Sequence, residues 1–361
     1  MTRMPGSAAV ALSALAALVL AGPAAAQTAP DILTYRGADR SQRILDGARR
    51  EGQVVLYSAM IVNQALRPVA DAFMKKYPFV KMRFWRADSE DIAAKLSAEI
   101  RANNVVADLA EGTGVGEYLV QANQAQPYYT PNIERIAEKY RDPAGLWTPT
   151  RLSYFSIAYN TKLLAADKAP RSFDALLDPQ WKGKMSWRIG SLSGTALFIT
   201  NLRMAWGEEK ARQYFQKLAE QKIVNFGSGS ARTLVDRVIA GEYPIALNIF
   251  AHHPLISAAK GAPVESILMD PVATTAATMT VPKLGKNPHA AILLADFILS
   301  TEGQEILAGA EYFPVRPDVA PLAGLDRVVP AKAGVPENFI GAEALNKYNE
   351  SSERIFQELF R

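Results

Sequence analysis

Cysteine is absent from the 361 residues of the chain. Disulfide bonds, thiolate metal sites and cysteine nucleophiles are therefore excluded. An apolar core alone has to hold the fold together. Hydrophobic residues make up 49% of the chain, which is enough for such a core. The length favours two lobes over a single one.

The chain also has few histidines and a small net charge. The chain has three histidines and a formal net charge of +4, with the basic residues spread along its length. A surplus this small does not indicate nucleic-acid binding, although it is compatible with attracting a small anion. Two of the histidines, His252 and His253, are adjacent, which makes them candidates for a binding site.

Long apolar runs are confined to the beginning of the chain. Residues 8–21 are apolar, follow a single early Arg3, and lead into the small residues Ala24 to Ala26. This pattern is typical of a secretory signal peptide, here residues 1–26. No other window approaches the ~18 apolar residues that span a bilayer. We therefore predict a mature protein that is free in the periplasm.

Strand and helix signals alternate from Gln53 onward, which indicates an α/β fold with a mostly parallel sheet. Two extended stretches rich in β-formers, near residues 146–162 and 270–283, are predicted to cross between two lobes with a hinged cleft between them. The predicted parts of the chain are lobe I (27–147), lobe II (148–270), the return crossover with the remainder of lobe I (271–320), and a C-terminal helical tail (321–361).

The two adjacent histidines follow a predicted strand, "YPIALNIF". Neighbouring residues on extended chain point to opposite faces, and Pro254 favours an extended backbone at His253. We therefore expect that the two rings cannot easily share one metal ion. One of them, His252, is expected to face the cleft and to make solute affinity depend on pH between roughly 5 and 8.

Two short segments could present backbone amides to a solute. In "SLSGTALF", Ser193, Gly194 and Thr195 precede an apolar helical run, so this helix start suits an anionic oxygen group, or is simply an ordinary cap. In "EGTGVG", the residues Gly112, Thr113 and Gly114 either approach a cleft or form a plain turn. The segment lacks the G-x-G-x-x-G spacing of dinucleotide sites, so no nucleotide cofactor is expected.

Catalytic signatures are weak. Neither G-x-S-x-G nor H-E-x-x-H occurs in the chain. A secreted hydrolase remains an alternative only because the protein is predicted to be exported.

Arg151 and Tyr154 are candidates for residues that line the cleft, because they lie on the first predicted crossover between the lobes.

Several segments together resemble a known family. They are "VVLYSA", "LLDPQWKGKM", "GEYPIAL", "AAILLADFILSTEGQEIL" and "YFPVRPDV", between about Glu51 and Asp318. With the signal peptide, they resemble the type II periplasmic solute-binding proteins of ABC importers, and their order is similar to the ferric-iron-binding branch. The resemblance implies a two-lobe clamp that closes on a solute and presents it to the membrane permease.

The iron ligands of that branch are not retained. The resemblance places Ile61 at the position of a histidine ligand, Thr113 at that of a glutamate, and Ala251 and His252 at those of a tyrosine pair. Ferric ion prefers anionic oxygen ligands, so no metal is expected, and any metal would have to use Glu111 and His252.

The sequence therefore predicts a monomeric, non-catalytic periplasmic receptor for a small anionic organic or phosphorylated solute. It needs no cofactor, binds no nucleic acid, and has ABC permease subunits as its partners. A ferric-iron or ferric-chelate receptor is the alternative within the same fold. The predicted solute contacts are Ser58, Met60, Gly112, Thr113, Gly114, Arg151, Tyr154, Ser193, Gly194, Thr195 and His252.

Overall fold

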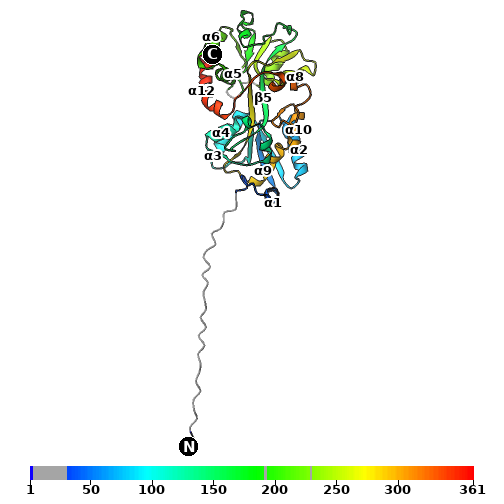
Figure 1. Cartoon of the computed structure of the whole chain (residues 1–361), viewed down its shortest axis with the longest axis vertical. Coiled ribbons are helices and arrows are strands. Elements are labelled where there is room, and N and C mark those ends of the chain that lie inside the picture. Colours follow the sequence, from blue (N-terminus) through cyan, green and yellow to red (C-terminus); the bar gives the residue numbers. More distant parts are fainter. Residues whose placement is uncertain (3–30, 191–192, 228–229) are drawn as a thin grey trace. The chain divides into compact units, whose positions relative to one another are not determined.

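Two long antiparallel strands run through the centre of the unit formed by residues 32–361 (Figure 1). They are β5 (Thr148–Asn160) and β10 (Val272–Pro282), and every residue of both is buried. The structure, a computed structural model, describes residues 1–2, 31–190, 193–227 and 230–361. The predicted signal peptide lies almost entirely outside the described residues. The lobe boundaries predicted at residues 148 and 271 fall at the beginnings of these two strands.

The first half-sheet contains the strands in the order β2-β1-β3-β10, followed by residues 148–154 of β5. Strand β1 is parallel to both β2 and β3, whereas β10 is antiparallel to β3 and to β5, so the sheet is mixed. The prediction of a mostly parallel sheet is therefore wrong for its centre. The other strands here are β1 (Gln53–Ser58), β2 (Lys81–Arg86), β3 (Leu109–Thr113), β4 (Ala125–Gln126) and β11 (Phe313–Pro314).

Side chains of β1 alternate between two apolar layers. Leu56 packs into one core and Tyr57 into the other, as the period of two along a strand requires. Helices on both faces explain why its residues Val54, Val55 and Leu56 are consecutive apolar residues. The first layer is formed with α1 (Arg40–Glu51), α2 (Arg67–Lys76), α9 (Pro288–Ile298) and α10 (Thr301–Gly309); the second with α3 (Ser89–Arg101) and α4 (Val115–Gln121).

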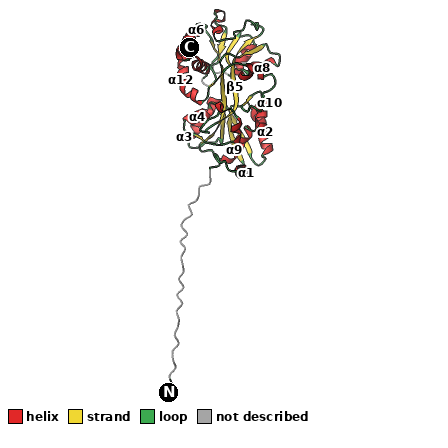
Figure 2. Cartoon of the chain, viewed as in Figure 1, coloured by secondary structure: helices red, strands yellow, loops and turns green. Residues whose placement is uncertain are grey.

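The second half-sheet begins within β5. Tyr154 still pairs with β10, but Phe155 pairs with Phe250 of β8, and the order continues as β8-β6-β7. Figure 2 shows helices on both sides of these strands. Its elements are β6 (Met185–Trp187), β7 (Val224–Asn225), β8 (Ile245–Phe250), β9 (Val264–Ile267), α5 (Thr195–Trp206), α6 (Glu208–Ala219), α7 (Ala231–Ile239) and α8 (His252–Ala258).

The C-terminal segment returns to the second half-sheet. After α11 (Pro330–Ala333), β12 (Glu337–Phe339) pairs with the beginning of β10, and α12 (Ala342–Leu359) packs against α5. Phe356 of α12 is buried against Trp187, with ring centroids 6.0 Å apart. The predicted helical tail is thus part of the second half-sheet's core.

Two helices follow each other closely after β10, since α9 ends at Ile298 and α10 begins at Thr301. Ser300 caps α10 because its hydroxyl accepts a hydrogen bond from the Gly303 amide at 3.2 Å. Among the described residues, no helix is long and apolar enough to cross a membrane.

Candidate binding site

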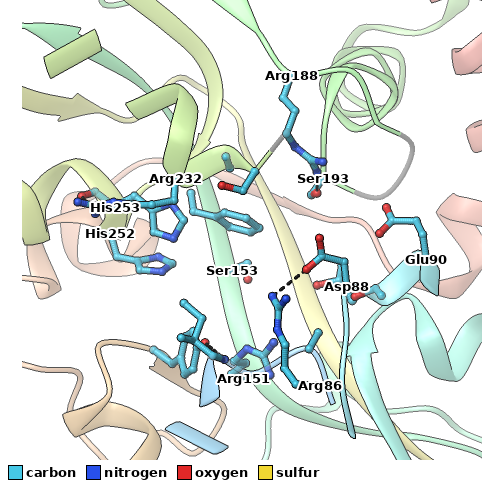
Figure 3. A pocket seen from close by; sticks show the side chains of 18 residues that line it. Arg86, Asp88, Glu90, Arg151, Ser153, Arg188, Ser193, Arg232, His252 and His253 are labelled. Atoms are coloured by element: carbon cyan, nitrogen blue, oxygen red, sulfur yellow. Dashed lines mark hydrogen bonds and ion pairs between the residues drawn. The ribbon is translucent and has the colours of Figure 1, made fainter. Parts of the chain in front are cut away.

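A cavity of about 290 Å³ lies where residues of both half-sheets meet (Figure 3). Much of its lining follows the carboxyl ends of parallel strands, where ligands of open α/β sheets bind. The contributing strands are β1, β2, β3, β6 and β8. The lining residues are Ala59, Ile61, Arg86, Asp88, Ser89, Glu90, Thr113, Arg151, Ser153, Arg188, Ser193, Ser230, Ala231, Arg232, Phe250, His252, His253 and Tyr312.

The lining is strongly cationic, with four arginines against two carboxylates. The beginnings of α3 and α7 also contribute to it, through Ser89 and through Ala231 and Arg232. Amides in the first turn of a helix lack intrahelical acceptors, and the helix dipole adds partial positive charge there. The arrangement therefore favours an anion over a cation.

Arg151 is held in place by a buried carboxylate. Its guanidinium forms an ion pair with Glu111, which is fully buried in the middle of β3. Ser58 and Thr150 donate hydrogen bonds to the same carboxylate at 2.6 and 3.0 Å. The Arg151 guanidinium also lies 4.7 Å from the centre of the Tyr312 ring, which limits its movement further. Its charge is largely balanced, so its role is to offer directed N–H donors.

Arg188 has a different environment. It follows Trp187, the last residue of β6, and its Nη2 hydrogen-bonds to the Ser193 hydroxyl. Among the described residues it has no carboxylate partner, and its buried Nε has no hydrogen-bond partner. Burial lowers the pKa of Arg188, while the fields of Glu90 and Asp88 oppose that shift. A cation without an acid partner in a cavity is the donor that an incoming anion can satisfy.

Arg232 lies beside the histidine pair in the first turn of α7. Its Nη2 donates to the Ser257 hydroxyl at 2.7 Å and its Nη1 to the His253 carbonyl at 3.3 Å. Its one acidic contact is Asp236, at 3.4 Å on the exposed side of the helix. Arg232 therefore also contributes net positive charge to the cavity.

His252 and His253 follow strand β8, as predicted, but they lie in the first turn of α8, so the prediction of an extended backbone with the two rings on opposite faces is wrong. The strand ends at Phe250, and Pro254 is accommodated in a first helical turn, where its missing N–H costs nothing. Both rings line the cavity, with centroids 4.5 Å apart.

The two imidazoles are uncharged at neutral pH. Burial, helped by His253, Arg151 and Arg232, lowers the pKa of His252 well below its usual value of 6.5. Burial and Arg232 lower the pKa of His253 to about 3. The expected dependence of solute affinity on pH between roughly 5 and 8 stays a prediction, because it concerns the protein with solute bound. The Nδ1 atoms of both rings are buried without a hydrogen-bond partner among the described residues.

Four of the predicted solute contacts line the cavity: Thr113, Arg151, Ser193 and His252. The others do not. Ser58 is fully buried and donates its hydrogen bond to Glu111. Met60 is buried in the core of the first half-sheet. Tyr154 packs against Phe313, with ring centroids 4.8 Å apart.

The predicted glycine contacts are structural. A Cβ at Gly112 would lie 2.8 Å from the Ser89 hydroxyl and 2.9 Å from a Val115 methyl group, so this glycine permits close packing between elements. Gly114 has a φ of 73° and precedes α4, a left-handed conformation that suits glycine.

The amides at the beginning of α5 are occupied, contrary to the prediction that they hold the anion. The Thr195 amide donates to the Arg188 carbonyl at 3.0 Å, and the Ala196 amide donates to the Gly190 carbonyl at 3.2 Å. Gly194 and Thr195 are buried behind the lining. Among the described residues of this segment, from Ser193 onward, only Ser193 lines the cavity.

The site residues predicted from the sequence do not include Arg86, Arg188, Arg232 or Tyr312, which all line the cavity. For Arg188 a signal existed, since it directly follows the short apolar strand "MSW" at the edge where ligands bind. Arg232 had none, because the sequence does not show which side of α7 faces the cavity.

The donor set does not suit a hard metal ion. No group of three or more His, Asp or Glu side chains that could hold a metal occurs in the part of the chain that the structure describes. Glu111 is already paired with Arg151. Two imidazoles beside Arg151 and Arg232 would be a poor site for ferric ion, which prefers anionic oxygen ligands.

Three comparisons with known proteins agree with this architecture. An uncharacterized protein of Haemophilus influenzae is 29% identical over 277 residues, 72% of this chain and 76% of the relative. Iron uptake protein A2 of Synechocystis sp. is 26% identical over 307 residues, 78% of this chain and 84% of the relative. The structure of the periplasmic binding protein AfuA from Actinobacillus pleuropneumoniae, with exogenous fructose-6-phosphate bound, is 25% identical, with a TM-score of 0.69 over 86% of this chain and 99% of AfuA.

The structural relatives confirm the predicted two-lobe fold and the resemblance to periplasmic solute-binding proteins, including ferric-binding ones. Residues 105–347 match the family model of bacterial extracellular solute-binding proteins. That segment covers more than half of the chain and contains Arg151, Arg188, Arg232 and both cavity histidines. The chain belongs to the bacterial extracellular solute-binding protein family.

Proposed function

We propose that this solute-binding protein captures a small organic or phosphorylated anion in the cavity and delivers it to the permease of an ABC importer. The observation that carries the proposal is Arg188, a cavity arginine with no acid partner and an unsatisfied Nε. AfuA, at 25% identity, has a phosphorylated sugar bound, which supports a solute of this class.

The cationic groups come from both half-sheets. Arg86 and Arg151 belong to the first half-sheet, and Arg188 and Arg232 to the second. An anion between them would attract both, so its binding free energy is larger when the two lobes approach each other. Differential affinity of this kind is what shifts a two-state protein toward its closed form.

The neutral imidazoles add directional hydrogen-bonding groups to the charged arginines of the cavity. Each ring can accept a hydrogen bond at one nitrogen and donate at the other, so His252 and His253 can satisfy hydroxyl or phosphate oxygens without adding charge. A bound anion also favours the imidazolium form, so binding is expected to raise the pKa of His252 from its lowered value.

Thermal unfolding tests the proposal. Residues 27–361 are measured with carboxylates, phosphorylated metabolites and amino acids, each well above its expected dissociation constant. A ligand about 100-fold above that constant stabilises the native state by roughly 2.7 kcal/mol, which is a readable shift.

The matched variants are Arg188→Gln and Arg83→Gln. Arg83 is an exposed residue on β2 that does not line the cavity. We expect Arg188→Gln to abolish the shift and Arg83→Gln to retain it. If both variants respond like the parent protein, or if no anion stabilises the parent, the proposed function is wrong.

A ferric-chelate receptor is the second candidate, because Iron uptake protein A2 is among the relatives. The cavity arginines could hold the carboxylates of a chelate such as ferric citrate, so the protein would not need a tyrosine pair. Unfolding with citrate alone and with ferric citrate separates the two. Stabilisation that requires iron favours the chelate.

A further inference from the structure

One wall of the cavity carries two carboxylates, and the opposite wall carries an arginine and two neutral imidazoles. Figure 3 shows Asp88 and Glu90 on one side and Arg232, His252 and His253 on the other, with Arg188 and Ser193 between them at one end. The acidic side comes from the beginning of α3 in the first half-sheet, and the basic side from the second half-sheet. A solute that fills the cavity therefore meets both signs of charge.

The acidic wall has a surplus of negative charge. Asp88 pairs with Arg86 at 2.7 Å, but Glu90 has no hydrogen-bond or ion-pair partner among the described residues. Acidic residues are common in first helical turns because they stabilise the helix dipole. That role does not account for Asp88, because its side chain makes no capping hydrogen bond and turns to Arg86 instead.

The opposite wall has unsatisfied polar groups of its own. His252 is 4% exposed, lines the cavity, and has an Nδ1 atom without a partner in the described structure. Buried polar atoms are usually hydrogen-bonded, so exceptions that line a cavity point to a missing ligand. The Nδ1 atom of His253 on the same wall, and the Nε atom of Arg188 at the end between the walls, are further such exceptions.

A solute that is anionic throughout would be repelled by Glu90. Resting on the proposed function, we propose that the solute is zwitterionic: its anionic group binds Arg188 and Ser193, and a protonated amine at its other end binds Glu90 and Asp88. An ammonium group supplies donors that both carboxylates can accept and balances the surplus charge of their wall. This class includes aminoalkyl phosphates, aminoalkyl phosphonates and amino acids.

Three matched probes test this inference by titration calorimetry on residues 27–361: 2-aminoethyl phosphate, 2-hydroxyethyl phosphate and ethyl phosphate. They share one anionic group and differ only at the far end. We expect the amine to bind about tenfold more tightly than ethyl phosphate, a factor worth about 1.4 kcal/mol. The hydroxyl compound should fall between them.

Three variants locate the effect. Glu90→Gln removes the unpaired charge, so it should remove the preference for the amine and leave the affinity for ethyl phosphate equal or higher. Glu220→Gln, an exposed residue at the end of α6, should change neither affinity. Arg188→Gln should weaken all three probes by a similar factor.

The outcomes separate this inference from the proposed function. Equal affinity for 2-aminoethyl phosphate and ethyl phosphate, with both affinities lost in Arg188→Gln, would contradict the proposal of a zwitterionic solute. It would still support the proposed function as a receptor for an anion. Equal affinity for 2-aminoethyl phosphate and 2-hydroxyethyl phosphate would contradict the proposal that the solute carries an amine, and would favour a polyol anion instead. Failure of all three probes, together with no stabilisation in the anion panel, would overturn both.

Discussion

At the scale of single residues, charge balance decides what each cavity group can do. Arg151 is paired with Glu111, so it is already satisfied in the free protein, whereas Arg188 is not. Leaving a buried donor unpaired costs free energy, and a ligand that satisfies the donor recovers this free energy. Arg188 should therefore contribute more to affinity than Arg151, which mainly orients its donors.

The buried imidazole of His253 predicts a loss of stability in acid. Its pKa is about 3 in the folded state and near 6.5 when unfolded, so below pH 6.5 the unfolded chain binds a proton that the native state does not. The contribution of this imidazole to the free energy of unfolding is fully present above pH 6.5. It falls by up to about 1.4 kcal/mol per pH unit below pH 6.5. Urea unfolding from pH 7.5 to 4.5 measures the effect.

The variant His253→Gln isolates the contribution of His253, since carboxylates also respond to acid. The free energy of unfolding of the parent minus that of the variant should fall steadily below pH 6.5. If this difference is the same at pH 7.5 and 4.5, the imidazole is not held neutral by burial.

Glu117 predicts the opposite pH dependence. This residue of α4 is 4% exposed, and burial raises its pKa to about 7, while Thr278 donates to its Oε2 at 2.7 Å. The native state then holds its proton more tightly than the unfolded chain, so stability is complete below pH 4.5 and is lost as the pH rises toward 7.

Glu117→Gln removes that loss, because glutamine resembles the protonated acid and can still accept from Thr278. Relative to the parent, the variant should gain about 3 kcal/mol in free energy of unfolding between pH 4.5 and pH 8. A pH-independent difference in urea unfolding would contradict the raised pKa.

The site was harder to predict from sequence than the fold, for a physical reason. Strands and helices follow local periodicity, so the alternation of strands and helices could be predicted from Gln53, which is the first residue of β1. Which side chains meet in a cavity depends on how loops turn. The position of Ser193 was found because a helix start is a local signal, but the occupied Thr195 amide depends on the distant Arg188 carbonyl.

At the scale of elements, α8 shows how one short helix can change a site. The pattern "IALNIF" predicted a strand correctly, but nothing in it showed that the chain would turn into a helix at His252. Consecutive side chains of a helix point about 100° apart, so both rings can reach one cavity, whereas on an extended chain they would point to opposite faces.

The close contact of α1 with α9 makes another prediction. A Cβ at Gly47 would lie 2.0 Å from the His289 ring, and that ring is fixed by a 2.7 Å hydrogen bond to Glu51. Gly47→Ala should therefore destabilise the protein by about 1–2 kcal/mol, although alanine favours a helix by ~1 kcal/mol.

A double-mutant cycle provides the control for this prediction. In a His289→Ala background the ring is gone, so Gly47→Ala should become neutral or stabilising. If Gly47→Ala destabilises both backgrounds equally, the contact with His289 is not the cause.

At the scale of the whole molecule, continuity of β5 and β10 links the two half-sheets. Each half-sheet has its own apolar cores, yet both long strands are buried along their full length, and α12 brings the C-terminus back to the second core. Residues 32–361 form one compact unit. The halves are therefore expected to move relative to each other on binding and still to unfold together.

Phe356→Ala tests that cooperativity. Truncating this buried ring should cost about 3–5 kcal/mol, because it leaves a cavity beside Trp187 in the core of the second half-sheet. If the molecule unfolds as one unit, calorimetry should show a single peak lowered by roughly 6 °C. Phe73→Ala, which truncates an equally buried ring in the first half-sheet, should shift the same single peak to a similar extent. Two peaks, of which Phe356→Ala lowers only one, would instead show that β5 and β10 join two independently stable lobes.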